Sequence, residues 1–281
     1  ADHLADQGAL EGGFGFRHVG SLIRQRPWTR SSSGQERSWH GRCHGAWRAA
    51  WIWTGRPRVP PAAGAGGHHQ PAALRPLAVC IDGYGAGPNQ SLENPLGERG
   101  PELHNWLFPT KIMQTTLFGA TSGSTGIDNE MAERSFENVG AWILGRNMFG
   151  PVRGEWQDED WKGWWGDAPP YHCDVLVLTH HPRKSFTLAD TTFHFVTDGI
   201  HAALDKAKAS AKGKDVRIGG GVSTIRQFLQ AGLIDEMHLA VSPVLLGKGQ
   251  HLLTGIDLTA LGFTTVKQIA GENAAHYVLS R

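Results

Sequence analysis

The stretch VRIGGGVST, residues 216–224, joins a short apolar run to the start of an amphipathic segment. Residues 216–218 are expected to form a buried strand, and 223–231 a helix that ends at Gly232. Three consecutive glycines let the backbone approach a phosphate closely, and the first amides of the helix point at it. The stretch matches neither GxGxxG nor a P-loop, so an ordinary strand–helix turn is the alternative.

Similar apolar runs recur from about residue 77 onward, and amphipathic segments separate them. The expected strands are 77–81, 141–144, 175–179, 193–196, 216–218 and 236–244. The expected helices are 101–108, 199–211 and 223–231. Strands that alternate with helices are typical of an α/β sheet with parallel pairs. The last two runs, 263–269 and 276–279, predict an antiparallel hairpin near the C-terminus.

Polar side chains follow two more of these strands, at the sheet edge where open α/β sheets bind ligands. The run GRN at 145–147 places an arginine after a glycine, and arginine suits a bidentate grip on phosphate. The run THHPR at 179–183 brings together a hydroxyl, two imidazoles and a guanidinium. The alternatives are a surface charge at the first place and a polar turn at the second. Together with the glycine triplet, these runs outline one extended ligand with two phosphate regions.

The N-terminal part has a different composition. Residues 1–75 contain ten Arg and four acids, a balance of 10 − 4 = +6, whereas the rest has 17 basic and 22 acidic residues, a balance of −5. The first part lacks Lys, Asn, Tyr and Met, the pattern of a GC-rich gene read outside its coding frame. We therefore expect residues 1–76 to be a disordered or non-native segment, and 77–281 to form the domain. An accessory element or a basic interaction arm is the alternative for the segment.

Overall composition excludes several classes of protein. With 40% hydrophobic and 19% charged residues and a net charge of +1, the chain is globular and is not a nucleic-acid binder by charge alone. No apolar run is long enough to span a membrane, and no signal peptide is recognisable. The 3 cysteines are widely spaced, which favours free thiols and the cytoplasm. We predict no metal site.

Several motifs in unbroken order resemble one family. These motifs are DGYGAGPN at 82–89, GRNMF at 145–149, LT at 178–179, GGG at 219–221, GLIDE at 232–236 and PVLLGKG at 243–249. The order is similar to that of the dihydrofolate reductase-like superfamily, specifically the reductase domain of the bifunctional riboflavin-biosynthesis deaminase–reductase and its stand-alone bacterial relatives. The resemblance covers about residues 77–281. It implies a three-layer α/β fold with a mostly parallel central sheet, helices on both faces and a C-terminal antiparallel hairpin.

The resemblance also implies a function and a set of site residues. The function is NADPH-dependent reduction of a pteridine-like or ribosylaminopyrimidine-like substrate. By analogy, the residues that hold the cofactor are Gly145, Arg146, Asn147, Thr179, His180, Arg183, Gly220, Gly221, Val222, Ser223 and Thr224. Asp82 takes the place of an acidic residue near the nicotinamide and the substrate. Relatives often form dimers, so a homodimer is expected.

Some alternatives stay open at this point. The deaminase signature H-x-E followed by P-C-x-x-C is absent from the sequence, so that half of the bifunctional enzyme is not expected. Glu102 is a candidate for supporting substrate protonation or a first-turn helix charge. The aromatic run at 161–165 would either wall a planar substrate or pack a loop on the core. The competing functions are a catalytically silent nucleotide-binding domain and nucleic-acid binding through the basic segment.

Overall fold

The computed structural model describes residues 72–150, 154–156 and 160–281, and the prediction for the segment before residue 72 lies outside them. The strands are β1 Ala72–Cys80, β2 Tyr84–Ala86, β3 Val139–Gly145, β4 Asp174–Leu178, β5 Phe186–Leu188, β6 Thr191–Val196, β7 Asp215–Gly220, β8 Glu236–Ser242, β9 Gln250–His251, β10 Thr264–Ala270 and β11 Ala275–Ser280. The α-helices are α1 Lys111–Phe118, α2 Ile127–Glu133, α3 Arg146–Phe149, α4 Gly199–Ala211 and α5 Val222–Gln230, and the 3-10 helices are η1 Gly100–His104 and η2 Arg134–Phe136.

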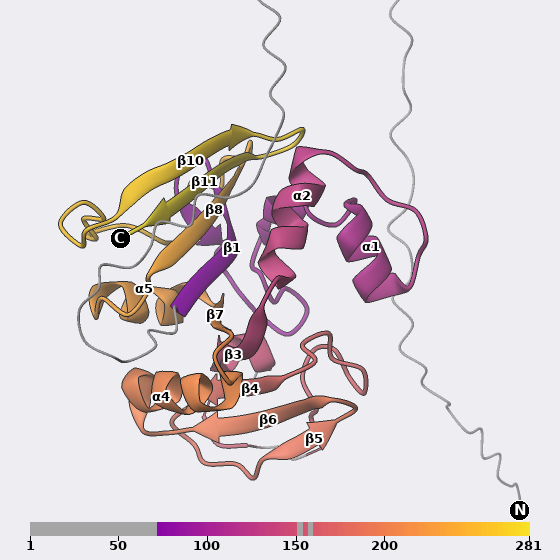
Figure 1. Ribbon diagram of the computed structural model, residues 1–281, viewed down its shortest axis with the longest axis vertical. Helices are drawn as coiled ribbons and strands as arrows, with labels where there is room; N and C mark the ends of the chain where they lie inside the picture. Colours follow the sequence, from indigo (N-terminus) through magenta and orange to yellow (C-terminus); the bar gives the residue numbers. More distant parts are fainter. Residues whose placement is uncertain (1–71, 151–153, 157–159) are drawn as a thin grey trace, which may run out of the picture. The chain divides into compact units, whose positions relative to one another are not determined.

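One nine-stranded sheet organises the described residues, in the order β10-β11-β8-β1-β7-β3-β4-β6-β5 (Figure 1). The neighbours from β8 through β1, β7, β3 and β4 to β6 all run parallel. The β10–β11 hairpin joins β8 antiparallel, and β5 joins β6 antiparallel at the other edge. The predicted mostly parallel sheet and the C-terminal hairpin are therefore confirmed.

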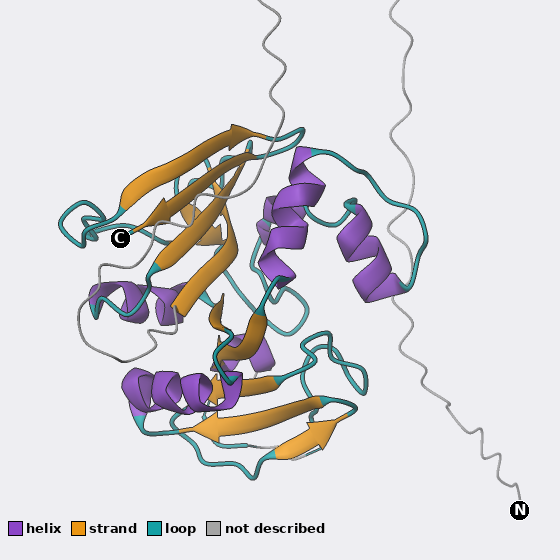
Figure 2. Ribbon diagram, viewed as in Figure 1, coloured by secondary structure: helices purple, strands orange, loops and turns teal. Residues whose placement is uncertain are grey.

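Helices lie on both faces of the sheet, as predicted (Figure 2). On one face, α4 and α5 pack against side chains that alternate along the strands, such as Ala141 and Ile143 of β3. The intervening Trp142 and Leu144 point the other way and pack with Phe149 of α3. Farther along that second face, α2 and the residues after η1 cover β8. Because both faces are covered, the central strands are continuous apolar runs, as parallel strands usually are.

The first strand differs from its prediction. β1 begins at Ala72, earlier than the predicted start at residue 77, so the last residues assigned to the N-terminal segment belong to the sheet. It is central, with β8 on one side along most of its length and β7 pairing only at Ala72 and Ala73. The register with β8 shifts between Leu74 and Leu77, next to Pro76. Proline has no N–H to donate to the hydrogen-bond ladder of a sheet. An irregularity in the register is therefore where a strand tolerates a proline best.

The described helices include none that is long and apolar enough to cross a membrane.

Candidate functional site

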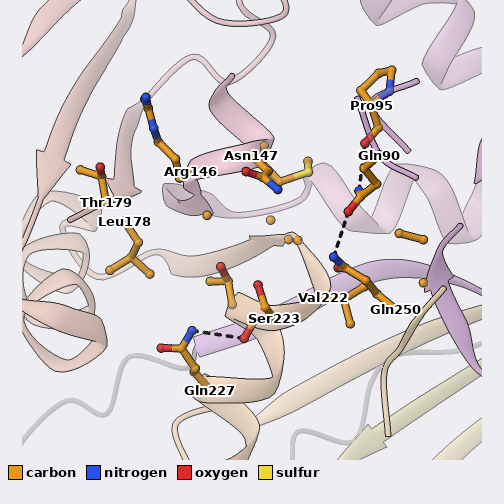
Figure 3. A pocket seen from close by; sticks show the side chains of 18 of the residues that line it. Gln90, Pro95, Arg146, Asn147, Leu178, Thr179, Val222, Ser223, Gln227 and Gln250 are labelled. Atoms are coloured by element: carbon orange, nitrogen blue, oxygen red, sulfur yellow. Dashed lines mark hydrogen bonds between the residues drawn. The ribbon is translucent and has the colours of Figure 1, made fainter. Parts of the chain in front are cut away.

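A cavity of about 560 Å³ opens at the carboxyl ends of the parallel strands (Figure 3). Its polar lining comes mainly from the ends of β3, β4 and β7 and the first turns of α3 and α5. The predicted site residues on its wall are Gly145, Arg146, Asn147, Thr179, His180, Gly220, Gly221, Val222, Ser223 and Thr224. The parallel register thus brings three separate sequence motifs to one site.

The glycine triplet forms the floor of the cavity between β7 and α5. Gly220 has φ +117°, a conformation that side-chain-bearing residues rarely adopt. Gly221 precedes the first turn of α5, and a Cβ placed there would meet no atom within 4 Å, so this backbone faces open space. The first amides of α5 have no acceptor within the helix, and the helix dipole adds partial positive charge at this end. This turn is therefore suited to an anionic group.

Gly145 allows the ends of β3 and β7 to meet. A Cβ at this position would collide with Oγ1 of Thr224, which is buried in the first turn of α5. The residue after it, Arg146, begins α3 and projects from the same edge of the sheet. Glycine at 145 is therefore a packing requirement that keeps the arginine next to the α5 turn.

For the NADPH that the sequence resemblance implies as the ligand, we expect Gly145→Ala to weaken binding about tenfold, because displacing α5 misplaces its amides by a fraction of an ångström. The double variant Gly145→Ala/Thr224→Ala removes the colliding hydroxyl, which is buried, and keeps the backbone amides of the α5 turn, so it should regain most of the affinity. Fluorescence titration of both variants measures the difference. Equal affinities in the single and double variants would contradict the packing argument.

Arg146 is a cation with unused hydrogen-bonding capacity. Its guanidinium carbon lies 3.0 Å from the centroid of the Trp156 ring. Its Nε and Nη1 are buried and have no hydrogen-bond partner among the described residues. Burial, helped by the nearby positive charge of Arg183, lowers the pKa of Arg146 to about 10. A cation in such surroundings is stabilised by a bound anion, and its donors match phosphate oxygens.

The β4 end contributes Thr179 and His180, but not Arg183. Oγ1 of Thr179 accepts a hydrogen bond from the backbone amide of His181 at 3.2 Å. This bond closes a turn, and the residues of the turn line the cavity. Arg183 is absent from the lining; its Nη2 donates to the Trp161 carbonyl at 2.8 Å, and its guanidinium carbon lies 4.8 Å from the Trp156 ring. The structure therefore places Arg183 behind Arg146, where it acts through its charge.

The two carboxylate candidates lie apart from the cavity wall. Asp82 accepts from the backbone amides of Leu246 and Gly247, at 3.2 and 2.6 Å. The hydrogen bond from the Cys80 thiol and these amides hold the pKa of Asp82 below its usual value. Glu102 pairs on the surface with Arg99 at 2.8 Å. Neither side chain is brought to the cavity, and Asp82 instead anchors the turn after β8.

Sequence reasoning missed part of the cavity wall. Thr197, Gly199 and Ile200 follow β6 and begin α4, and the rule applied to the other strand ends would have found them. Gln90, His104 and Gln250 come from loops and short elements, and no local pattern signals them. The aromatic run at 161–165 was expected either to wall a substrate or to pack a loop on the core, and its contacts decide between the two.

Trp161 and Trp164 pack on α3 and do not form a substrate wall. Nε1 of Trp161 donates to the Phe149 carbonyl at 3.0 Å, and Nε1 of Trp164 to the Asn147 carbonyl at 3.1 Å.

Among the described residues, no group of three or more His, Cys, Asp or Glu side chains could hold a metal ion.

The fold and the cavity define an α/β protein with a site of ligand size at the carboxyl edge of its sheet. The chain belongs to the RibD C-terminal domain family, whose sequence profile matches residues 76–275. This membership confirms the family resemblance found in the sequence and gives the chain a reductase role.

Known proteins similar to this chain have been found by sequence and by structure. The uncharacterized protein YyaP of Bacillus subtilis (strain 168) is 33% identical over 156 residues, which cover 51% of this chain and 79% of YyaP. A riboflavin-biosynthesis candidate from Shewanella sp. PV-4 has a TM-score of 0.47 and 20% identity, covering 75% of this chain and 98% of its own. The deaminase/5-amino-6-(5-phosphoribosylamino)uracil reductase of Thermotoga maritima has a TM-score of 0.44 and 13% identity, covering 75% and 56%.

Proposed function

We propose that this chain is an NADPH-dependent reductase of a pteridine-like or ribosylaminopyrimidine-like substrate. The observation that carries the proposal is the convergence of Arg146, the β4 end and the α5 first turn on one cavity. Two positively polarised places on one wall suit a ligand with two phosphate regions. The family's reductase role supports a nicotinamide cofactor as that ligand.

The residues present fit such a cofactor. The residues that would hold it are Gly145, Arg146, Asn147, Thr179, His180, Gly220, Gly221, Val222, Ser223 and Thr224. The open space beside Gly221 and the positive charge of Arg146 on the cavity wall are the two features that a bound dinucleotide would use. When bound, NADPH supplies the hydride.

The protein's own contribution is positioning and exclusion of water. Leu77, Ala78 and Met148 give the cavity apolar wall between its polar ends. Aliphatic walls of this kind keep a planar substrate against the cofactor and displace water. In the described part of the chain, no Asp or Glu lines the cavity, so the groups on the wall suited to exchange a proton with substrate are the imidazoles of His104, His180 and His181.

The proposed setting is a bacterial cytoplasm, where the free thiols of Cys80 and Cys173 stay reduced. A homodimer remains a prediction, and a small molecule is the proposed partner. The catalytically silent alternative predicts the same cofactor binding without turnover. NADPH consumption with 5-amino-6-(5-phosphoribosylamino)uracil or dihydrofolate therefore separates the two, and binding without turnover of either substrate would favour the silent domain.

A charge placed in the α5 turn tests the cofactor site directly. Ser223 is exposed in the first turn of α5. In Ser223→Asp the carboxylate favours the helix N-terminus, so the fold is kept, but it repels a bound pyrophosphate. We expect NADPH affinity to fall about tenfold or more, while the nearly isosteric, neutral Ser223→Asn retains it.

The measurement is fluorescence titration of the full chain with NADPH, with NADH as the comparison. Tighter binding of NADPH than of NADH supports the proposal. No binding of either nucleotide to the unmodified chain would refute it, as would equal affinity of the aspartate and asparagine variants.

A further inference from the structure

Two glutamine side chains form a hydrogen-bonded pair on the cavity wall. Nε2 of Gln250 donates to Oε1 of Gln90 at 2.9 Å, and Nε2 of Gln90 donates to the Pro95 carbonyl at 2.9 Å. All three residues line the cavity. Figure 3 shows them together on the side of the view opposite Arg146 and Thr179. This pair therefore belongs to the end of the cavity away from the predicted phosphate contacts.

The Pro95 carbonyl fixes the orientation of both amides. A backbone carbonyl only accepts, so the group of Gln90 that faces it must be the NH₂. Oε1 of Gln90 then faces Gln250, which must present its own NH₂ in turn. No described residue donates to Oε1 of Gln250. The pair thus leaves Gln250 with an unused acceptor beside an NH₂ that has a second hydrogen to donate.

The surrounding backbone holds this pair in place. Gln250 in β9 lies opposite Ala86 in β2. The preceding Gly249 has φ +134°, and a Cβ there would collide with the Ala86 carbonyl. The loop that carries Gln90 and Pro95 is closed by a hydrogen bond from the amide of Gly87 to the Leu96 carbonyl at 2.9 Å. A rigid backbone on both sides pre-organises the two amides.

The chemistry of this end selects one kind of heterocycle edge. A primary amide pairs in bidentate fashion with an edge that presents a donor beside an acceptor. A lactam, with its N–H next to C=O, is such an edge. An amino group beside a ring nitrogen is a second edge of this kind, whereas an N-methylated imide presents only acceptors there and cannot pair with the NH₂ and Oε1 of Gln250 together.

We propose that Gln250, oriented by Gln90, is the specificity-determining residue that recognises the lactam edge of the substrate. The proposal rests on the proposed function, because it places the substrate at this end of the cavity. It adds a preference: heterocycles whose ring N–H lies beside a carbonyl bind, and those whose ring nitrogens are methylated, so that only acceptors remain at that edge, are rejected. Such rejection is strong because a ligand without the matching edge leaves polar groups of the site without hydrogen-bond partners.

Two compounds with the same ring test the preference. We expect the full chain, saturated with NADP⁺, to bind 5,6-diaminouracil at least about tenfold more tightly than 5,6-diamino-1,3-dimethyluracil in isothermal titration calorimetry, because methylation removes the ring N–H donors. Gln250→Glu exchanges the NH₂ for an acceptor that the substrate carbonyl repels, so the preference should shrink to about threefold or less. Gln90→Leu removes the group that orients Gln250, and the preference should shrink to about threefold or less. Gln268→Glu on the exposed strand β10 is the matched control and should behave as wild type.

NADPH titration of each variant separates this proposal from the proposed function. Variants that fold keep their NADPH affinity, because neither glutamine is among the predicted cofactor residues. An unchanged preference in Gln250→Glu, or equal or undetectable binding of both compounds to the wild-type chain, would overturn the role of Gln250. Failure to bind NADPH with the ring preference intact would count against the proposed cofactor alone.

Discussion

Replacing Arg146 with leucine is expected to weaken NADPH binding about 100-fold and to stabilise the protein in the absence of the nucleotide. Two charge-assisted hydrogen bonds from the guanidinium to phosphate are together worth about 3 kcal/mol, which is about a 100-fold change in affinity. In the free protein Nε and Nη1 of Arg146 have no described partner, and burial has already lowered the pKa of the guanidinium to about 10. A buried arginine whose donors lack partners lowers the free energy of unfolding unless a bound anion neutralises it.

Leucine removes the charge and keeps apolar contact with the Trp156 ring, which lies under the guanidinium. The gain in unfolding free energy should be up to about 1 kcal/mol, since the lost cation–π contact offsets part of it. Thermal unfolding with and without NADPH measures both effects. The midpoint of the leucine variant should be higher without nucleotide and should barely rise when it is added.

Arg146→Lys separates charge from geometry. Lysine keeps the positive charge but lacks the planar fork of donors, so we expect an intermediate loss of about tenfold. Arg134→Leu, which removes an arginine half-exposed beside Glu236, is the control for a lost surface charge. If the leucine variant binds NADPH as tightly as the wild type, Arg146 is not a phosphate ligand.

The strand ends were predictable because a local pattern decides them. In a parallel sheet, each apolar run delivers its last residues to the same edge, so Arg146, Thr179 and Gly220 could be assigned to one site from sequence. Helix α4 was also predicted with its observed bounds, because its apolar face has a clear helical period, and Ala203 and Ala207 are fully buried.

Features that depend on distant partners were not predictable. Gln90 and Gln250 meet only because β2 pairs with β9, and neither strand is long enough to leave a period-2 pattern. Asp82 follows the first strand, as expected, but Gly83 turns the chain at φ +83° and the carboxylate binds the amides after β8. Proximity in sequence to a strand end therefore does not decide which way a side chain points.

Helix α2 was missed for a related reason. Its buried face includes Asp128 and Asn129, polar residues that a hydrophobic pattern assigns to solvent. The amides of Ile127 and Asp128 at its start donate to the Glu272 carboxylate, both at 2.9 Å. These amides hold the pKa of Glu272 below its usual value. The cap of this helix comes from the turn between β10 and β11, so no local signal marks where it begins.

Asp128 makes a second connection between α2 and the β10–β11 hairpin. Replacing it with alanine is therefore expected to destabilise the protein by about 3 kcal/mol or more. Its Oδ2 accepts from the amide of Asn273 at 2.8 Å, and its Oδ1 lies 2.9 Å from Nε2 of His276. Because a carboxylate only accepts, that ring nitrogen carries the hydrogen. Nδ1 of His276 forms a hydrogen bond with Nε2 of His238 on β8, at 3.0 Å.

Alanine at 128 would remove an acceptor from the Asn273 amide and would leave the His276 ring without its acceptor in a place that water does not reach, since His276 is 0% exposed. Urea unfolding measures the loss. Asp128→Asn keeps an oxygen acceptor and should cost about 1 kcal/mol, and Asp205→Ala on the exposed face of α4 should cost less than about 0.5 kcal/mol. A cost for Asp128→Ala no greater than that of the α4 control would show that the chain Asp128–His276–His238 does not hold the hairpin, and β8 with it, against the central strand β1.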